Sequence, residues 1–403
     1  SNNYNFTNFE NLDFTWRITG DDRMISSGRL TSLNLNPQES KEIFFNTSNI
    51  VQRAGVRYFL TVEAKTKNSK PLVPKKHLVA WEQFELPLYL PLSKKETNAQ
   101  FDLVTQENDT LIEIKSNDVH IVFDKETGFL ESYEVGLVKY LKHPIVSNFW
   151  RAPNDNDLGN GMPKRTGIWK DAGKRMQLKD IAVSEVENSI QVSSIHFDSL
   201  SSTTIFTKYK IYNEGAIHLD RKIEILDNTL PEIPRIGVKL SMLGSFNNVT
   251  WFGRGPHESY WDRKQSAAIG VYSGSVWDQT YRYVRPQETG NKTDVFWMAV
   301  FNEKRNGLMA VGLPSFDGSV HRYPYDDLDY YPGAQRHGKL DLVPKDHTDW
   351  LIDIKQMGVG GDNSWGAKPM KKYTLYPGVY NQSMLLIPFT SQGDFTKLSK
   401  KRF

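Results

Sequence analysis

The stretch TIFTKYKIYNEGAIHLDRKIEIL, residues 204–226, decides the fold class of this chain. Both of its arms alternate between apolar and polar residues, which is the pattern of half-buried β-strands. The letters NEG at 213–215 are a turn sequence between the arms, so the stretch predicts a long β-hairpin. The second arm sets four apolar residues on one face, where Arg221 is the exception: Ile217, Leu219, Ile223 and Ile225.

The same alternation recurs toward the N-terminus, in residues 14–18 and again in residues 58–62. Aromatic residues make up 12% of the chain, which favours β-structure because large rings pack well on pleated faces. No segment has a convincing helical pattern, since the glycines within 162–176 leave room for only one short turn. The sequence therefore predicts an all-β protein.

A chain of 403 residues exceeds one ordinary hydrophobic core, so two domains are expected. The boundary is placed after Pro91, where the polar run SKKETNAQ at 93–100 has no residues that could form a core. We predict an immunoglobulin-like β-sandwich over residues 1–92 and a linker over 93–107. Residues 108–403 are expected to form a larger all-β domain made of two big stacked sheets.

Composition excludes several classes of partner and site. A net charge of +3 is small for this length, so neither nucleic acid nor an anionic membrane is an expected partner. The absence of cysteine excludes disulfides, thiolate metal sites and a cysteine nucleophile. No apolar run approaches the roughly 20 residues that cross a bilayer. The chain opens SNNYNF without an initiator Met, so we expect a piece of a longer soluble polypeptide, cytoplasmic or periplasmic.

The segment MGVGGDNSWG, Met357 to Gly366, is the strongest candidate for function. Two glycines free the backbone for a turn, and Asp-Asn-Ser supplies short polar groups that fix a loop. Trp365 follows at once, and an indole held on a rigid loop is a suitable platform for the apolar face of a sugar ring. The alternative is that Trp365 only closes the end of a β-sandwich.

A second candidate is FWRAPNDNDLG at 149–159, where four Asn and Asp residues follow Pro153. A Ca²⁺ loop needs oxygen ligands at alternate positions and a glycine at the sixth, and neither possible register fits. We therefore interpret the run as a structural loop in which Arg151 is the counter-ion of the carboxylates.

A third candidate is WFGRGPHESYWDR at 251–263. A glycosidase needs two carboxyls on either side of the scissile bond, and Glu258 and Asp262 are too close in an irregular segment to be aligned that way. Arg254 and Arg263 are expected to pair with these carboxylates and lower their pKa values, which is the wrong direction for a general acid. Ion-paired loop carboxylates are the favoured interpretation, and no catalytic residue is predicted here.

A fourth segment, YVRPQETGN at 283–291, places Glu288 in a turn. His257 together with Glu288 or Glu258 has the residue types of a base and acid in a mutarotase-like epimerase, so that function stays open. Nothing matches a nucleophile elbow, a P-loop, a dinucleotide fingerprint or a zinc spacing, and no metal ligand is predicted.

Taken in order, these motifs resemble the C-terminal portion of glycoside hydrolase family 2 β-galactosidases. The stretches at 14–16, 58–62 and 80–84 are similar to the immunoglobulin-like domain of that family. The later motifs are more specific and lie at 124–128 (DKETG), 151–157, 255–263 and 360–365 (GGDNSW). The resemblance implies that a galactose-mutarotase-like supersandwich follows the immunoglobulin-like domain.

The resemblance also implies which part of the parent carries the catalytic residues. In the family, the nucleophile, the acid/base glutamate and the Mg²⁺ and Na⁺ ligands lie on a preceding (β/α)₈ barrel that this chain does not encode. The tryptophan of the GGD-N-S-W motif, here Trp365, then forms part of the β-galactoside substrate pocket. The parent is expected to be a homo-oligomer, and the fragment alone to be inactive and to need no cofactor. A stand-alone carbohydrate-binding module remains an alternative, which sugar affinity of the isolated chain would support.

Overall fold

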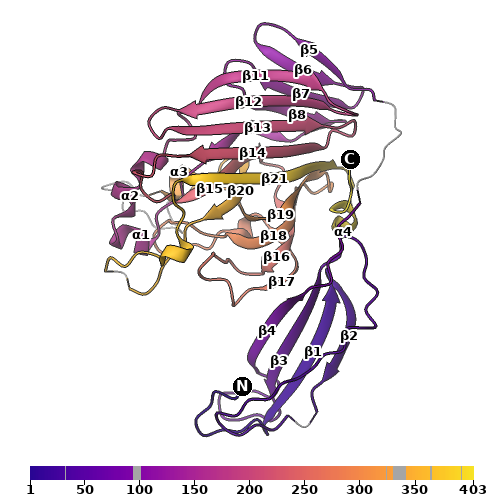
Figure 1. Cartoon of the computed structure of the whole chain (residues 1–403), viewed down its shortest axis with the longest axis vertical. Helices are drawn as coiled ribbons and strands as arrows, with labels where there is room; N and C mark the ends of the chain where they lie inside the picture. The colour runs from indigo at the N-terminus through magenta and orange to yellow at the C-terminus, as the bar shows by residue number, and fades with distance from the viewer. Residues whose placement is uncertain (32, 94–100, 324, 330–341, 364, 392) are drawn as a thin grey trace. The chain divides into compact units, whose positions relative to one another are not determined.

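The computed structural model describes residues 1–403 apart from 32, 94–100, 324, 330–341, 364 and 392 (Figure 1). The chain divides into two compact units, Ser1–Lys95 and Glu96–Lys401. The linker predicted at 93–107 falls partly outside the described residues. Its last four residues contradict the prediction, because Val104–Glu107 form strand β5 of the second unit.

The first unit is built on one antiparallel sheet in the order β2-β1-β3-β4. Both predicted strands are present, and Trp16 pairs with Val62 across them. The segments outside the sheet pack on the same face of β1, since Phe9 contacts Phe14 and Phe45 contacts Trp16 at ring distances of 5.1 and 5.6 Å. The strands are β1 (Leu12–Gly20), β2 (Arg23–Arg29), β3 (Tyr58–Thr66) and β4 (Leu78–Leu86).

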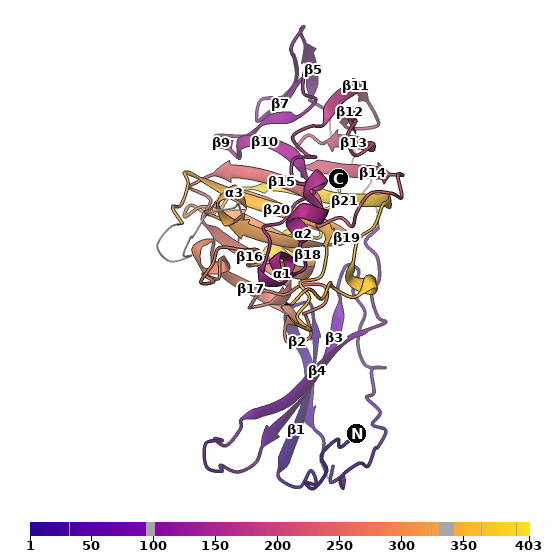
Figure 2. The same ribbon diagram turned by 90° about the vertical axis from the view of Figure 1, so that its left-hand side faces the viewer.

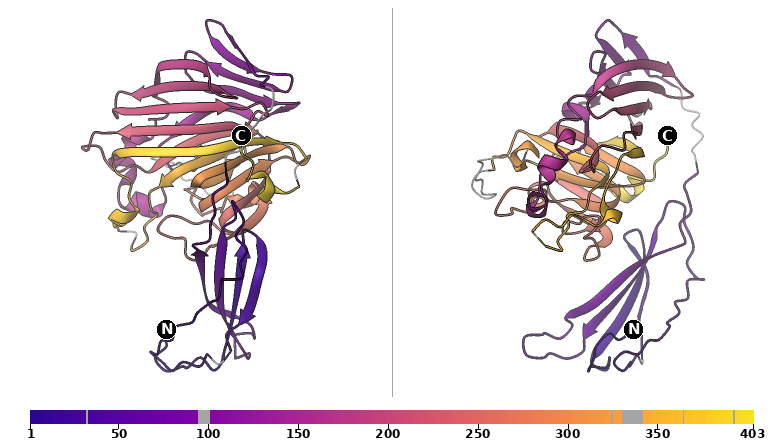
Figure 3. Two further views of the ribbon diagram at one scale, coloured as in Figure 1. Left: turned by 45° about the vertical axis from the view of Figure 1, so that its right-hand side comes forward. Right: turned by 60° about the vertical axis from the view of Figure 1, so that its left-hand side comes forward.

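The second unit stacks a small sheet on a large one. The small sheet runs β5-β6-β7-β8-β9, where the remaining strands are β6 (Leu111–Lys115), β7 (Val119–Asp124), β8 (Leu130–Val135) and β9 (Val138–Lys139). The large sheet has 12 strands, and its main path is β10-β15-β20-β19-β21-β14-β13-β12-β11. A branch of β16, β17 and β18 joins that path through the β18–β19 pair (Figure 3).

The twelve strands of the large sheet are β10 (Leu141–Asn148), β11 (Gln177–Glu185), β12 (Ile190–Asp198), β13 (Thr203–Ile211), β14 (Ile217–Ile225), β15 (Arg235–Leu243), β16 (Asn248–Gly255), β17 (Ala268–Ser275), β18 (Lys292–Phe301), β19 (Gly307–His321), β20 (His347–Gln356) and β21 (Gly378–Phe389). The described helices are single turns, of which the sequence predicted only one, within 162–176: α1 (Asp155–Gly159), α2 (Met162–Arg165), α3 (Tyr325–Leu328) and α4 (Phe395–Leu398), with 3₁₀ turns η1 (Gly167–Trp169), η2 (Trp277–Gln279) and η3 (Lys371–Tyr373).

The predicted hairpin forms β13 and β14, paired from Thr203↔Ile225 to Ile211↔Ile217. Gly215 closes its turn with a φ of 75°, a backbone conformation that glycine adopts without strain. A side chain there would also meet Val135 of β8 at 2.5 Å, so the turn lies directly under the small sheet. The architecture is all-β, as predicted.

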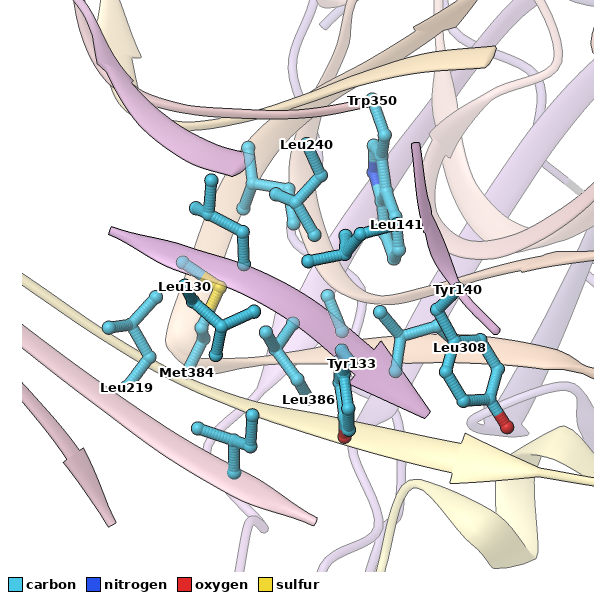
Figure 4. Close-up of a cluster of buried hydrophobic side chains, with 14 of the residues drawn as sticks. Leu130, Tyr133, Tyr140, Leu141, Leu219, Leu240, Leu308, Trp350, Met384 and Leu386 are labelled. Carbon is cyan, nitrogen blue, oxygen red and sulfur yellow. The ribbon is translucent and has the colours of Figure 1, made fainter. Parts of the chain in front are cut away.

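The main core lies between the two sheets (Figure 4). Leu130 and Tyr133 of β8 face apolar residues from five strands of the large sheet, and the hydroxyl of Tyr133 donates to the carbonyl of Gly215 at 2.5 Å. The facing residues are Leu219, Leu240, Leu308, Trp350 and Leu386. Burying this many large side chains is the main source of stability for the sandwich.

A second apolar cluster lies farther along the same face of β14, where Ile223 and Ile225 pack against Trp169 and other residues near α1 and α2. Arg221 separates the two clusters. Its guanidinium donates to the carbonyl of Gly237 at 3.1 Å, to Gln382 Oε1 at 2.9 Å and to Ser147 Oγ at 2.6 Å. Arg221 thus ties three strands together inside the protein, which accounts for the one exception in the hairpin pattern.

Candidate functional site

The Trp365 loop, defined as residues 357–366, follows directly from β20 at the same end of the second unit as α1 and α2 (Figure 2). Gly360 and Gly361 have φ angles of 69° and 133°, which few other residues adopt. Asn363 Oδ1 accepts hydrogen bonds from the amides of Trp365 at 3.0 Å and Ala367 at 3.3 Å. The predicted role of Ser364 lies outside the described residues.

The Trp365 side chain points away from the protein, and the residue is 92% exposed. The alternative in which it closes the end of the sandwich is therefore wrong for this chain. An exposed indole on a hydrogen-bonded loop loses apolar contact with water when a ring stacks on it. The loop geometry therefore suits a binding platform.

The base of the loop is held by Asp262. Its carboxylate accepts hydrogen bonds from the amides of Val359 at 3.0 Å and Gly360 at 2.8 Å. Gly358 has no room for a side chain, because a Cβ there would lie 2.5 Å from Asp262 Oδ2. The carboxylate thus fixes the backbone just before the Gly-Gly turn, and hydrogen bonds to a charged acceptor are among the stronger ones.

Arg151 holds the same loop backbone from inside the protein. It is fully buried and forms a two-pronged ion pair with Asp157, with Nε–Oδ2 and Nη2–Oδ1 distances of 3.1 and 2.8 Å. Its remaining donors reach the carbonyls of Met357 and Gly358. The predicted pairing of Arg151 with the carboxylates of 154–157 is confirmed, and the loop carbonyls add to it.

The Asn/Asp run forms the short helix α1 rather than a metal loop. Asn154 caps it, since its side chain accepts from the amide of Asp157 at 2.8 Å and Asp157 accepts from the amide of Asn154 at 3.1 Å. Asn156 then donates to the carbonyl of Val359 at 3.0 Å. Asp155 meets Arg285 and Gln287, so the segment at 283–291 is tied to α1 as well.

Glu258 is fully engaged as a hydrogen-bond acceptor. It pairs with Arg263 at 2.7 Å and also accepts from the Tyr283 hydroxyl, from Thr289 Oγ1 and from the amide of Gly290. The predicted partnership of Arg254 is wrong, because that guanidinium pairs with Asp294 at 2.6 Å. These four donors fix the Glu258 carboxylate in place, as expected of an ion-paired loop carboxylate.

The residues named as acid and base of an epimerase each have other partners, although His257 and Glu258 line the same cavity. His257 is exposed and its Nε2 lies 2.9 Å from Ser266 Oγ. Glu288 is buried and paired with Arg235 at 3.0 Å. Among the described residues no group of three or more His, Asp or Glu side chains is placed to hold a metal ion. Within the same part of the chain, no helix is long and apolar enough to cross a membrane.

Sequence reasoning missed the roles of Asp262 and of the Met357 and Gly358 carbonyls. Asp262 is 97 residues from Val359 and Arg151 is 206 residues from Met357. Neither separation follows a local spacing rule, so no pattern in one sequence signals these contacts. The structure brings three of the sequence motifs together at one loop: 151–157, 262 and 357–366.

Comparison with known proteins finds two family models. The model "Beta galactosidase small chain" matches residues 115–386, and "Beta-galactosidase, domain 4" matches residues 1–87. A β-galactosidase of Priestia megaterium is 32% identical over 377 residues, covering 93% of this chain and 36% of the relative. One from Pseudoalteromonas haloplanktis is 27% identical over 402 residues, covering 95% and 37%.

The chain therefore spans about a third of the length of these curated relatives. Among solved structures, a galactose 1-epimerase from Lactobacillus acidophilus superimposes with a TM-score of 0.40 at 9% identity, covering 72% of this chain and 99% of the other.

Proposed function

This chain belongs to the β-galactosidase family, and from that premise we propose that it is the C-terminal, non-catalytic portion of an enzyme that hydrolyses terminal β-D-galactosides. The proposal rests on the match of 67% of the chain, residues 115–386, to the small-chain model, and on the share of the relatives that the chain leaves uncovered. The remaining two thirds of the parent then carry the chemistry. We assign to that part a (β/α)₈ barrel of glycoside hydrolase family 2 with two catalytic glutamates and a retaining mechanism.

In this proposal the Trp365 loop supplies one aromatic wall of the substrate pocket. The observation that carries it is the combination of an indole that is 92% exposed with a loop base that is hydrogen-bonded on two sides. Preorganisation matters because a rigid platform loses little conformational entropy when a sugar ring stacks on it. We assign the Mg²⁺ and Na⁺ of the parent to the barrel. In this proposal the 403-residue chain supplies no group to the chemical step.

The test is steady-state kinetics of the full-length parent carrying Trp365→Ala. A platform that touches substrate and transition state alike supplies uniform binding, so its loss raises KM and leaves kcat nearly unchanged. Removing an aromatic anchor costs about 2 kcal/mol or more, which corresponds to about a 30-fold rise in KM. Trp365→Phe is expected to recover part of this loss, because it restores an aromatic face.

Trp277→Ala is the matched control, since Trp277 is also exposed, at 41%, and lies outside the loop. That variant should keep the parental KM. Wild-type values of both kcat and KM in the Trp365→Ala enzyme, with lactose and with nitrophenyl galactoside, would contradict the platform role.

A further inference from the structure

A cavity of about 660 Å³ lies in the second unit, between the β16–β17 hairpin and the segment that leads into β18. Its lining includes Glu258, Tyr281, Tyr283 and Lys292. Sites for small molecules usually fall in the range of about 300–1,000 Å³ and combine apolar walls with a few fixed polar groups. The cavity therefore has the size and the lining of a ligand site, and none of the roles assigned above uses it.

Lys292 is the most unusual group in the cavity. It is 3% exposed, and its Nζ donates one hydrogen bond, to the carbonyl of Gly290 at 2.9 Å. The same atom lies 5.2 Å above the ring of Trp251. In the described part of the chain it forms no ion pair with a carboxylate, and a buried ammonium without a counter-ion is costly.

The charged side chains that line the cavity have an excess of positive charge. Glu258 is neutralised by Arg263, as described above. Asp278 accepts from the amide and hydroxyl of Ser275, and Arg282 donates to the hydroxyl of Tyr323. Three cations and two carboxylates line the cavity, so the lining carries one net positive charge, and Glu258 is the carboxylate whose charge acts on Lys292.

The mouth of the cavity offers aromatic surface. Tyr281 is 64% exposed, and its ring lies 4.6 Å from that of Tyr283, which is held by its hydrogen bond to Glu258. Two neighbouring rings give a face on which the body of a small cyclic ligand can rest. The cavity thus combines a cationic end with an aromatic side.

We propose that this cavity binds a monosaccharide-sized organic anion, whose acidic group pairs with the ammonium of Lys292 and whose ring lies against Tyr281 and Tyr283. The anion would supply a direct ion-pair partner for the buried ammonium, and the volume leaves space for a sugar ring. The site is separate from the role of Trp365, so the two proposals can fail independently.

The test is isothermal titration calorimetry of the 403-residue chain with three probes that share one sugar ring. Glucuronate and glucose 6-phosphate carry an acidic group, and glucose is the neutral match. At least one anion is expected to bind about tenfold or more tighter than glucose, a difference of about 1.4 kcal/mol. A preference for glucuronate or for the phosphate identifies the acidic group. Equal affinity for all three probes, or no binding of either anion, overturns the proposal.

The anion affinities of single-residue variants test whether binding takes place in this cavity. Lys292→Met is expected to weaken the anion about tenfold or more, whereas Lys208→Met, an exposed lysine on β13, leaves its affinity unchanged. Trp365→Ala should also leave it unchanged, which separates this site from the platform. If Lys292→Met does not fold, Tyr281→Ala decides, because that side chain is exposed. A wild-type affinity in Tyr281→Ala or in folded Lys292→Met contradicts the site.

The pH dependence gives an independent readout. Burial lowers the pKa of Lys292 to about 8, so anion affinity should be highest below pH 8 and fall by up to about tenfold per pH unit above it. Burial also lowers the pKa of the nearby His321 to about 3 and raises that of Tyr283 to about 12, so neither changes charge between pH 7 and 9. The other charged or titratable groups that line the cavity are Glu258, Arg263, Arg282, Asp278, Tyr281 and exposed His257, and Arg235 lies behind it near His321. The fall should disappear in Lys292→Met, and an identical fall in that variant contradicts the assignment.

Discussion

At the scale of single residues, Asp262 controls the position of the Trp365 loop. An Asn at this position keeps one acceptor oxygen but turns an amino group toward the second backbone amide. Asp262→Asn is therefore expected to destabilise the chain by about 1–3 kcal/mol, as judged by urea unfolding. In the full-length parent it should raise KM in the same direction as Trp365→Ala.

Asp362→Asn is the control for charge, since Asp362 is exposed in the same loop and has no hydrogen bond among the described residues. It should match wild type in both measurements. Equal effects of the two substitutions would mean that the carboxylate of Asp262 acts through long-range charge and not through its bonds to Val359 and Gly360.

The buried pair of Arg151 and Asp157 makes a second residue-scale prediction. Arg151→Met leaves the Asp157 carboxylate buried without its counter-ion, so we expect a loss of about 3–5 kcal/mol in the free energy of unfolding. Arg151→Met combined with Asp157→Leu should recover part of that loss, because the uncompensated charge is gone. Denaturant unfolding of both variants measures this, and additive losses in the double variant would show that the two residues are not coupled.

Some features of single residues in the candidate site could be predicted from the sequence, and others could not. The Gly-Gly turn and a polar side chain that fixes the loop follow from local residue chemistry, and Asn363 bears this out, whereas local chemistry left open whether the indole is exposed. Arg151 was identified as a counter-ion because Asp157 lies only six residues away. The bonds from Asp262 and Arg151 to the loop could not be predicted, because they join segments whose proximity depends on the whole sheet.

At the scale of elements, β19 and β20 place two buried carboxylates opposite each other, Asp317 and Asp353. Burial raises the pKa of Asp317 to about 6, and Lys355, 4.0 Å away, lowers it only in part. A folded-state pKa above the unfolded value means that the native state binds the proton more tightly. Tighter proton binding by Asp317 therefore stabilises the native state below about pH 4, and this contribution to the free energy of unfolding is lost as the pH rises through about 6.

Asp317→Asn should therefore be more stable than wild type at pH 7, by up to about 3 kcal/mol, and its stability should change less between pH 4 and 6. Urea midpoints measured across this range test it. Asp346→Asn is a control of opposite sign, because Lys142 and His347 lower the pKa of that exposed carboxyl to about 2. Its removal should reduce stability at neutral pH, and parallel pH curves for wild type and Asp317→Asn would contradict the prediction.

Elements with a strong periodic pattern were predictable, and elements without one were not. The hairpin β13–β14 follows from the alternation in 204–226. Strand β5 falls within the linker predicted at 93–107, and its residues are mostly exposed in the structure. Pairing with β6 holds β5 in place, and that pairing leaves no trace in the local residue pattern.

At the scale of the whole molecule, the proposed function predicts that the 403-residue chain is inactive alone. A retaining glycosidase needs a nucleophile and an acid/base carboxyl, and both are assigned to the absent portion. Hydrolysis of nitrophenyl β-galactoside by the purified chain should equal the buffer blank. Supplying the remainder of the parent as a separate polypeptide should give activity, and turnover by the chain alone at an enzyme-like rate would contradict the assignment.

Family membership was accessible from the sequence because several short motifs occur in one order along the chain. Composition and periodicity alone predict an all-β protein of two domains, and they do not predict the family. Substrate, oligomeric state and compartment depend on surfaces and segments that local patterns do not encode, so they stay predictions.

The position of β21 in the large sheet has a consequence for synthesis of the protein. β21 pairs with β14 along one edge and with β19 along the other, so among the described strands it alone joins the β10–β15–β20–β19 half to the β14–β13–β12–β11 half. It is also the last of the described strands along this chain, so the ribosome delivers it after the other strands of the large sheet. Until residues 378–389 emerge, the nascent chain holds two half-sheets with unpaired inner edges, which are prone to aggregate. A premature stop codon before Gly378 should therefore yield insoluble protein, although most of the sandwich would already have been translated.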